Sequence, residues 1–112
     1  MAKLIYKIKI QKQGAVSMTI PMQVVKTLDI KVKDYLLVSY DEQLDAMVIV
    51  QDKGQTPLVT QHRIKVQRQG AINMTIPMEI VRKMDIRIGN YVDVEFDITN
   101  DCMIVTKSKV AV

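Results

Sequence analysis

The sequence is poor in the residues that build catalytic and metal sites. It has one cysteine, one histidine and no tryptophan among 112 residues. A single cysteine cannot form an internal disulfide, and Cys102 with His62 provides too few ligands for a four-ligand zinc site. Cys102 lies in an apolar stretch that indicates a buried strand, so we expect a core thiol and not a nucleophile. We therefore expect no metal and no cofactor, and a reducing, cytoplasmic setting.

Long hydrophobic runs and catalytic motifs are also missing. No run of 18 apolar residues occurs, so we expect no membrane helix. Charges scattered through residues 1–10 are unlike a signal peptide. No nucleophile elbow, glycine-rich phosphate loop or acid–base constellation is present, so we expect neither an enzyme nor a small-molecule substrate. The five aromatic residues form no base-stacking platform, which argues against single-stranded nucleic acid.

The chain is instead two copies of one unit. Shifted by 56 residues, QKQGAVSMTIPMQVVKTLDI (11–30) falls on QRQGAINMTIPMEIVRKMDI (67–86). Residues 8–53 and 64–109 share 20 identities over 46 gapless positions, and most other pairs are conservative. This level of identity establishes an internal repeat.

The repeat predicts three segments: a first copy over 1–53, a linker over 54–60 and a second copy over 61–112. A unit of about 46 residues is marginal alone when it has neither a disulfide nor a metal. We therefore expect the two copies to complete each other's sheets around one core. The result would be a single compact domain with a pseudo-two-fold axis.

Each copy predicts the order strand, strand, helix, strand, strand, which makes the fold mainly β with short helices. A turn at Gly14 separates the first two strands, and Pro21 suits the first position of the helix. Alternating or helical spacing of apolar residues defines the elements. In the first copy they are strands over 5–11 and 16–20, a helix over 22–28, and a hairpin over 35–40 and 46–50.

Basic and acidic residues are separated along each copy. The net charge is +4, with eight basic and six acidic residues in each copy. Residues 3–33 hold seven lysines and one acid, whereas 34–52 hold five acids and no base. Residues 63–87 hold six bases and two acids, whereas 93–101 hold four acids and no base. A protein that needed only solubility would intersperse its charges, so this pattern favours a basic nucleic-acid surface.

Alternation along the first strand of each copy places cations on one face, beside glutamines. Lysine and arginine replace each other between the copies at these positions, and neither is replaced by an acid. The alternative is a solvated sheet face without a ligand. A pseudo-two-fold axis would bring both rows to one surface, where they would contact phosphates. The predicted DNA-binding residues are Lys7, Lys9, Lys12, Lys26, Arg63, Lys65, Arg68 and Arg82.

In both copies a basic strand and a glycine precede a short strand, Thr-Ile-Pro, a short helix, Asp-Ile and a hairpin. This order resembles the AbrB/MazE/SpoVT superfamily, and the resemblance covers nearly the whole chain. It implies two swapped-hairpin subunits fused in tandem as an interlaced barrel, with DNA bound by the first hairpin and the start of the helix. The chain departs from the family at Asp29 and Asp85, where glycine is frequent. It also departs at Ala15 and Ala71, where bacterial members often carry arginine.

The sequence thus predicts a double-stranded DNA-binding protein, a transcriptional regulator of the AbrB-like type. One alternative is the antitoxin of a toxin–antitoxin pair, which the superfamily also contains. Such antitoxins usually use a long C-terminal tail, and we expect none here because only 110–112 follow the second repeat. Another alternative is a protein–protein interaction module that uses the acidic hairpins. Further self-association of the pseudo-dimer stays open.

Overall fold

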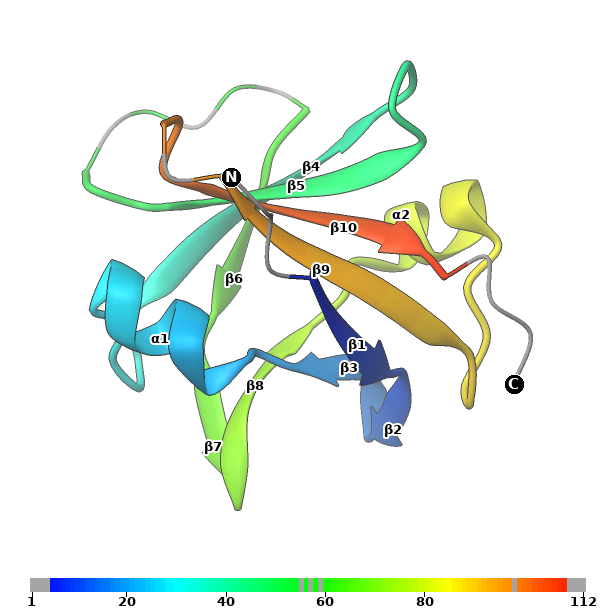
Figure 1. Cartoon of the computed structure of the whole chain (residues 1–112), viewed down its shortest axis with the longest axis horizontal. Helices are drawn as coiled ribbons and strands as arrows, with labels where there is room; N and C mark the ends of the chain where they lie inside the picture. Colours follow the sequence, from blue (N-terminus) through cyan, green and yellow to red (C-terminus); the bar gives the residue numbers. More distant parts are fainter. Residues whose placement is uncertain (1–4, 55, 57, 59, 98, 109–112) are drawn as a thin grey trace.

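The structure, a computed structural model, describes residues 5–54, 56, 58, 60–97 and 99–108. Within these residues the chain is mainly β, with ten strands in two antiparallel sheets and two short helices (Figure 1). The first copy forms β1 (Ile5–Lys9), β2 (Gln11–Gln13), β3 (Ala15–Thr19), α1 (Met22–Leu28), β4 (Tyr35–Asp41) and β5 (Ala46–Gln51). The second copy forms β6 (His62–Lys65), β7 (Gln67–Gln69), β8 (Ala71–Thr75), α2 (Met78–Met84), β9 (Tyr91–Asp97) and β10 (Cys102–Lys107).

Each sheet contains strands of both copies. The six-stranded sheet has the order β1-β9-β10-β5-β4-β6, and the four-stranded sheet has the order β2-β3-β8-β7. β1 of the first copy therefore pairs with β9 of the second, and β6 of the second copy pairs with β4 of the first. Within the described residues neither sheet closes on itself. The predicted mainly β class with short helices is confirmed.

The strand registers define a pseudo-two-fold axis. In β3 and β8, Met18 lies opposite Met74, its own equivalent in the repeat. In β5 and β10, Val48 lies opposite Ile104, which is again its equivalent. A residue can face its own symmetry mate in an antiparallel pair only where the axis crosses that pair. The axis therefore passes through the middle of both sheets.

Each copy passes from one sheet to the other at a buried corner residue. The expected single strand over 5–11 is wrong, because β1 ends before Ile10 and β2 belongs to the other sheet. Ile10 is fully buried; its N–H donates to the Asn90 carbonyl (2.8 Å) and its carbonyl accepts from Gly89 N–H (2.9 Å). Val66 is the equivalent corner of the second copy. Ile10 points inward, as it would in a straight strand. The alternation of side chains therefore does not reveal that the chain changes sheet at this residue.

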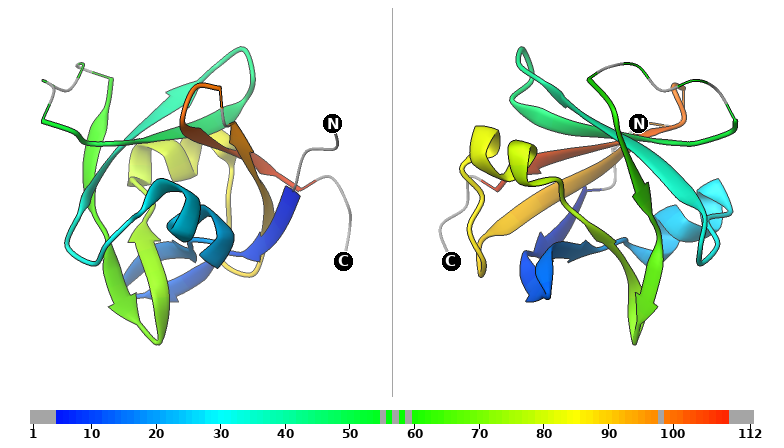
Figure 2. Two further views of the ribbon diagram at one scale, coloured as in Figure 1. Left: turned by 60° about the vertical axis from the view of Figure 1, so that its left-hand side comes forward. Right: turned by 180° about the vertical axis from the view of Figure 1, so that it is seen from behind.

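The helices are positioned by their apolar faces. Val24, Val25 and Leu28 of α1 are buried, as are the equivalent residues of α2. Pro21 is the N-cap and not the first helical residue, since its ψ of 135° is extended. α1 and α2 lie on opposite sides of the molecule (Figures 1 and 2). In the part of the chain that is described, neither helix is long and apolar enough to cross a membrane.

Candidate nucleic-acid interface

The hairpins β2–β3 and β7–β8 project together from one end of the molecule, the lower end in Figures 1 and 2. We call this the hairpin end. Each hairpin turns at a glycine with φ of 77°, at Gly14 and Gly70. A residue with a side chain would be strained at this left-handed φ, and glycine is not, so glycine permits the tight turn. Lys12 and Arg68 are exposed and lie close to the hairpin tips. Across the hairpins they face Val16 and Ile72.

One face of the four-stranded sheet is uncharged at this end, with Gln11 and Gln67 exposed on it and Ser17 and Asn73 buried at 5% exposure. Met18 and Met74 are buried in the core, so their strand neighbours lie on the opposite face. There the Thr19 hydroxyl donates to Asn73 Oδ1 at 3.1 Å. Exposed Gln11 lies beside Ser17 in the register, on the same face. The residues of this face are Gln11, Ser17 and Thr19 with their equivalents Gln67, Asn73 and Thr75.

Cations border this face on both sides. Lys7 and Lys9 are exposed on β1, and Arg63 and Lys65 are exposed on β6. β1 and β6 are the edge strands of the six-stranded sheet, and they contact β3 and β8 of the four-stranded sheet. The predicted rows of cations and glutamines are therefore divided at the corner residues. The cations flank the hairpin end, and the glutamines lie on the hairpins.

Lys26 and Arg82 occupy a different place. Both are exposed on the helices, which lie on opposite sides of the molecule (Figure 1). The structure does not bring these two residues together. The hairpin end gathers the other six predicted residues from β1, β6 and the two hairpins.

Acidic residues concentrate at the opposite end. The β4–β5 turn carries Asp41, Glu42 and Asp45, and the β9–β10 turn follows Asp97 and includes Asp101. Both turns lie at the upper end of the molecule in Figure 1 and in both views of Figure 2, away from β2–β3 and β7–β8. The acidic turns are therefore separated in space from the hairpins, whereas Asp93 lies beside Lys7 and Asp52 beside Arg63.

The predicted DNA-binding cations differ from the other lysines and arginines in their ion pairs. Within the described residues, seven of the eight predicted DNA-binding residues make no ion pair, and Arg63 is the exception. Several other cations do have acidic partners. Lys31 is 4.0 Å from Asp29, and Lys83 is 3.2 Å from Glu79. The unpaired charges are thus mainly those of the predicted interface.

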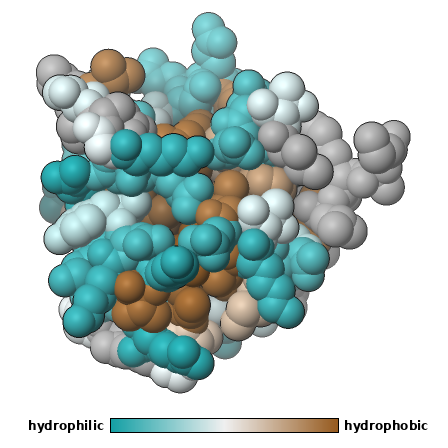
Figure 3. Space-filling model, turned by 90° about the vertical axis from the view of Figure 1, so that its left-hand side faces the viewer, coloured by the Kyte–Doolittle hydropathy of each residue, from teal (hydrophilic) through white to brown (hydrophobic). Residues whose placement is uncertain are grey.

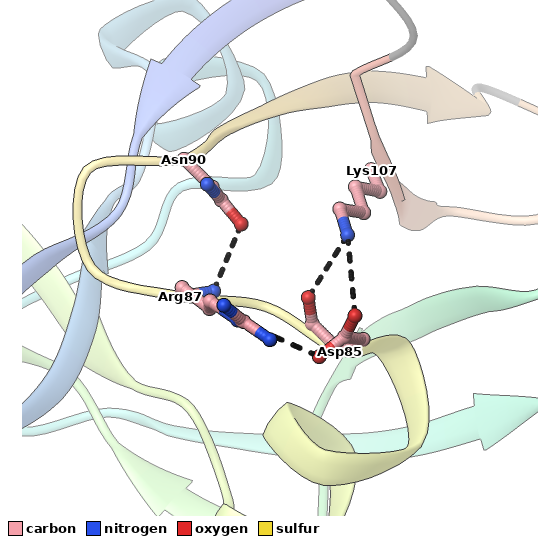
Figure 4. A network of polar contacts seen from close by, with 4 residues as sticks. All are labelled: Asp85, Arg87, Asn90 and Lys107. Atoms are coloured by element: carbon pink, nitrogen blue, oxygen red, sulfur yellow. Dashed lines mark hydrogen bonds and ion pairs between the residues drawn. The ribbon is translucent and has the colours of Figure 1, made fainter.

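The end of α2 illustrates the paired type of cation (Figure 4). The Lys107 ammonium donates to the Asp85 carbonyl at 3.0 Å and lies 3.8 Å from its carboxylate. Arg87 Nε is 3.8 Å from the same carboxylate, and Arg87 N–H donates to Asn90 Oδ1 at 3.0 Å. Asp85 is in the left-handed region, with φ of 53°. These cations stabilise the end of a helix.

Arg63 binds an acid that the sequence analysis did not single out. Its guanidinium bonds the Asp52 carboxylate from Nε and Nη2 and lies over the Tyr35 ring at 5.1 Å from the centroid. The Asp52 side chain is only 3% exposed. Hydrogen bonds from Gly54 N–H and then from Arg63 hold the pKa of Asp52 below its usual value. The linker between the two residues gives no sequence signal for this pair.

The two residues considered for chemistry lie in different surroundings. Cys102 is buried in β10, and burial raises the pKa of its thiol, so it stays protonated near neutral pH. His62 Nε2 is 3.3 Å from the Glu79 carboxylate. Across the described ranges, no three His, Cys, Asp or Glu side chains cluster as metal ligands.

Hydrophobic side chains also reach the surface. On the side of the molecule that carries α1, a hydrophobic area is bordered by hydrophilic side chains (Figure 3). Two repeat-related pairs are exposed: Met22 with Met78, at 56% and 54%, and Val32 with Ile88, at 38% and 54%.

Comparison with known proteins gives no further guide: no family model, no curated protein and no solved structure matches the chain. The residues at the hairpin end provide exposed Gln11 and Gln67, flanked by Lys7, Lys9 and Lys65, which make no ion pair within the described residues.

Proposed function

We propose that the chain binds double-stranded DNA through the hairpin end and acts as a transcriptional regulator of the AbrB-like type. The observation that carries this proposal is the contrast in ion pairing. Of the six predicted cations at the hairpin end, five have no acidic partner in the described part of the chain, and the acidic turns lie at the other end. Unpaired cations on one surface are what a phosphate backbone requires, because most of the affinity comes from their release of counterions.

The exposed glutamines of the hairpins suit contact with base edges. A two-stranded ribbon fits the DNA major groove, and amide side chains can pair with adenine. Gln11 and Gln67 are exposed on the two hairpins. In this proposal the cations position the duplex and the hairpin side chains read it. The pseudo-two-fold axis relates the hairpins, so they would address two half-sites.

The strand exchange supports the finer architectural proposal. Because β1 pairs with β9 and β6 with β4, each copy contributes the edge strand of the other. This arrangement is compatible with two swapped-hairpin subunits fused in tandem. The same interlacing would hold the two hairpins at a fixed spacing.

The test removes unpaired cations without disturbing an ion pair. Replacing Lys9, Lys12, Lys65 and Arg68 with alanine should lower affinity for duplex DNA at 0.1 M salt, by about tenfold for each phosphate that the variant no longer binds. The plot of log affinity against log salt should flatten by about 0.9 for each of these phosphates. Fluorescence anisotropy over a range of salt concentrations measures both quantities. The four side chains are exposed, so the fold should persist.

The matched control removes the same number of charges elsewhere, by replacing Lys31, Lys53, Lys83 and Lys107 with alanine. Its affinity should fall much less, because these residues lie outside the hairpin end. An equal loss in both variants would mean that only net charge matters. If the wild-type chain binds no duplex at low salt, the proposal is wrong, and a protein partner of the acidic turns, a toxin included, becomes the better hypothesis.

A further inference from the structure

The two halves of the hairpin end share one backbone but differ in side chains. Left-handed residues agree closely between the copies: φ is 53° at both Asp29 and Asp85, and 77° at both Gly14 and Gly70. The strand registers agree as well, since Lys7 faces Asp93 as Arg63 faces Leu37. Any difference in DNA contact must therefore come from substitutions between the repeats.

Arg63 is already engaged. With Arg63 in place the Asp52 side chain is 3% exposed, and its carboxylate also accepts a hydrogen bond from Gly54 N–H. A phosphate that drew the guanidinium away would break a charge-assisted contact made from two of its nitrogens, which is among the stronger polar interactions in proteins. Arg63 therefore stays with Asp52, and the pair presents little net positive charge to DNA.

Lys7 occupies the equivalent position in the first half, but its surroundings differ. The residue equivalent to Asp52 is Ser108, which carries no charge. The Lys7 ammonium lies over the Tyr91 ring, 5.8 Å from its centroid. Asp93 is its cross-strand neighbour, yet within the described residues the two form no ion pair. Lys7 can therefore exchange a weak ring contact for a phosphate.

The second half also contains an additional acid. Glu79 lies in the first turn of α2, where α1 has Gln23. Its carboxylate lies 3.3 Å from His62 on β6 and 3.2 Å from Lys83. The residues equivalent to these partners, Tyr6 and Thr27, are uncharged. The first half thus has an uncharged surface where the second has an ion-paired one.

We infer that the two half-sites are unequal and that the chain binds a duplex in one orientation, with the half formed by β1 and the β2–β3 hairpin making more phosphate contacts. This inference depends on the proposed DNA binding. Asp52 acts as the residue that sets the asymmetry, because it neutralises Arg63 and has no acidic equivalent in the other copy.

Exchanging single residues between the repeats tests the role of Asp52. Asp52→Ser should release Arg63, raise duplex affinity by up to about tenfold at 0.1 M salt and steepen the salt dependence by about 0.9. Ser108→Asp should have the opposite effect through Lys7. Lys7→Ala should flatten the salt dependence by about 0.9, whereas Arg63→Ala in the Asp52→Ser background should remove the gain of Asp52→Ser. No change in affinity or salt dependence from Asp52→Ser in the folded protein would overturn the role of Asp52.

Orientation is measured directly with a DNA-cleaving reagent attached to one hairpin. The exposed residues Ala15 and Ala71 can each be changed to cysteine in a Cys102→Ala background; Ala46, equivalent to Cys102, shows that alanine suits this site. On a duplex selected from a random pool, each conjugate should cut one end only, and the two should cut opposite ends. Cutting of both ends equally by each conjugate would overturn the inference while leaving DNA binding intact. Absence of any duplex binding would instead refute the proposed function.

Discussion

At the scale of single residues, the pair between Asp52 and Arg63 joins the two copies. Asp52 directly follows the last strand of the first copy, and Arg63 lies in the first strand of the second. Their ion pair spans the linker, while Asp52 N–H donates to the Tyr35 carbonyl at 3.0 Å. The same side chains thus close the linker and neutralise one cation of the proposed interface.

The pKa of Asp52 predicts how this pair depends on pH. A carboxyl group whose pKa is lowered by folding stabilises the fold above its unfolded pKa and loses that effect as the pH falls through its folded pKa. For Asp52 the usual value is 3.8, and the folded value lies below it. Asp52→Asn should therefore lower the melting temperature at pH 7, and its difference from wild type should shrink below about pH 4. Thermal unfolding by circular dichroism at pH 7 and pH 3 measures both differences; an unchanged difference would contradict the assignment.

At the scale of elements, the two helices depend on tertiary contacts. Each has only seven residues, and isolated helices shorter than about 12 residues are marginal in water. Three apolar side chains of each helix are buried in the shared core. At the helix ends, the Gln51 amide donates to the Leu28 carbonyl at 2.7 Å, and Lys107, its repeat equivalent, donates to Asp85. Strands β5 and β10 therefore hold the ends of the helices.

Removal of one buried side chain should show how far α2 depends on the core. Ile80 is 1% exposed, so Ile80→Ala should lower the free energy of unfolding by about 2–4 kcal/mol. Met78 lies on the same helix, is 54% exposed and provides the control. Met78→Ala should change the free energy of unfolding by less than about 0.5 kcal/mol. Urea denaturation of both variants gives the comparison. Equal losses of stability in the two variants would contradict the dependence of α2 on core packing, since alanine raises helix propensity at both positions.

Most elements could be predicted from the sequence because their signals are local. The spacing of Val24, Val25 and Leu28 gave a helix with the observed bounds, and the polar residues after Tyr40 marked a hairpin. The change of sheet at Ile10 could not be predicted, since an inward residue looks the same in a straight strand and at a corner. The ion pair of Arg63 was missed for a related reason: its partner lies across the linker, beyond any local pattern.

At the scale of the whole molecule, the repeat explains why one chain carries both halves of the core. β1 and β6 each pair with a strand of the other copy, and β5 pairs with β10 at the axis. The core therefore contains buried side chains from both copies, such as Met18 and Met74. What the sequence could not provide was the side-chain asymmetry of the interface, because it arises from neighbours that only the interlaced strands bring together.

The interlacing predicts the behaviour of one half alone. Residues 1–54 contain β1 to β5, but the strands that pair with β1, and with the outer edges of β4 and β5, belong to the second copy. Without them the fragment exposes apolar residues of the shared core, and so small a unit has no disulfide to compensate. It should either remain largely unfolded or form a homodimer in which β1 pairs with β4 of the other chain. Circular dichroism and sedimentation velocity over a hundredfold range of concentration distinguish these states, with the full chain as the reference, since its pairings are intramolecular. A folded fragment that stays monomeric at every concentration would contradict the interlaced core.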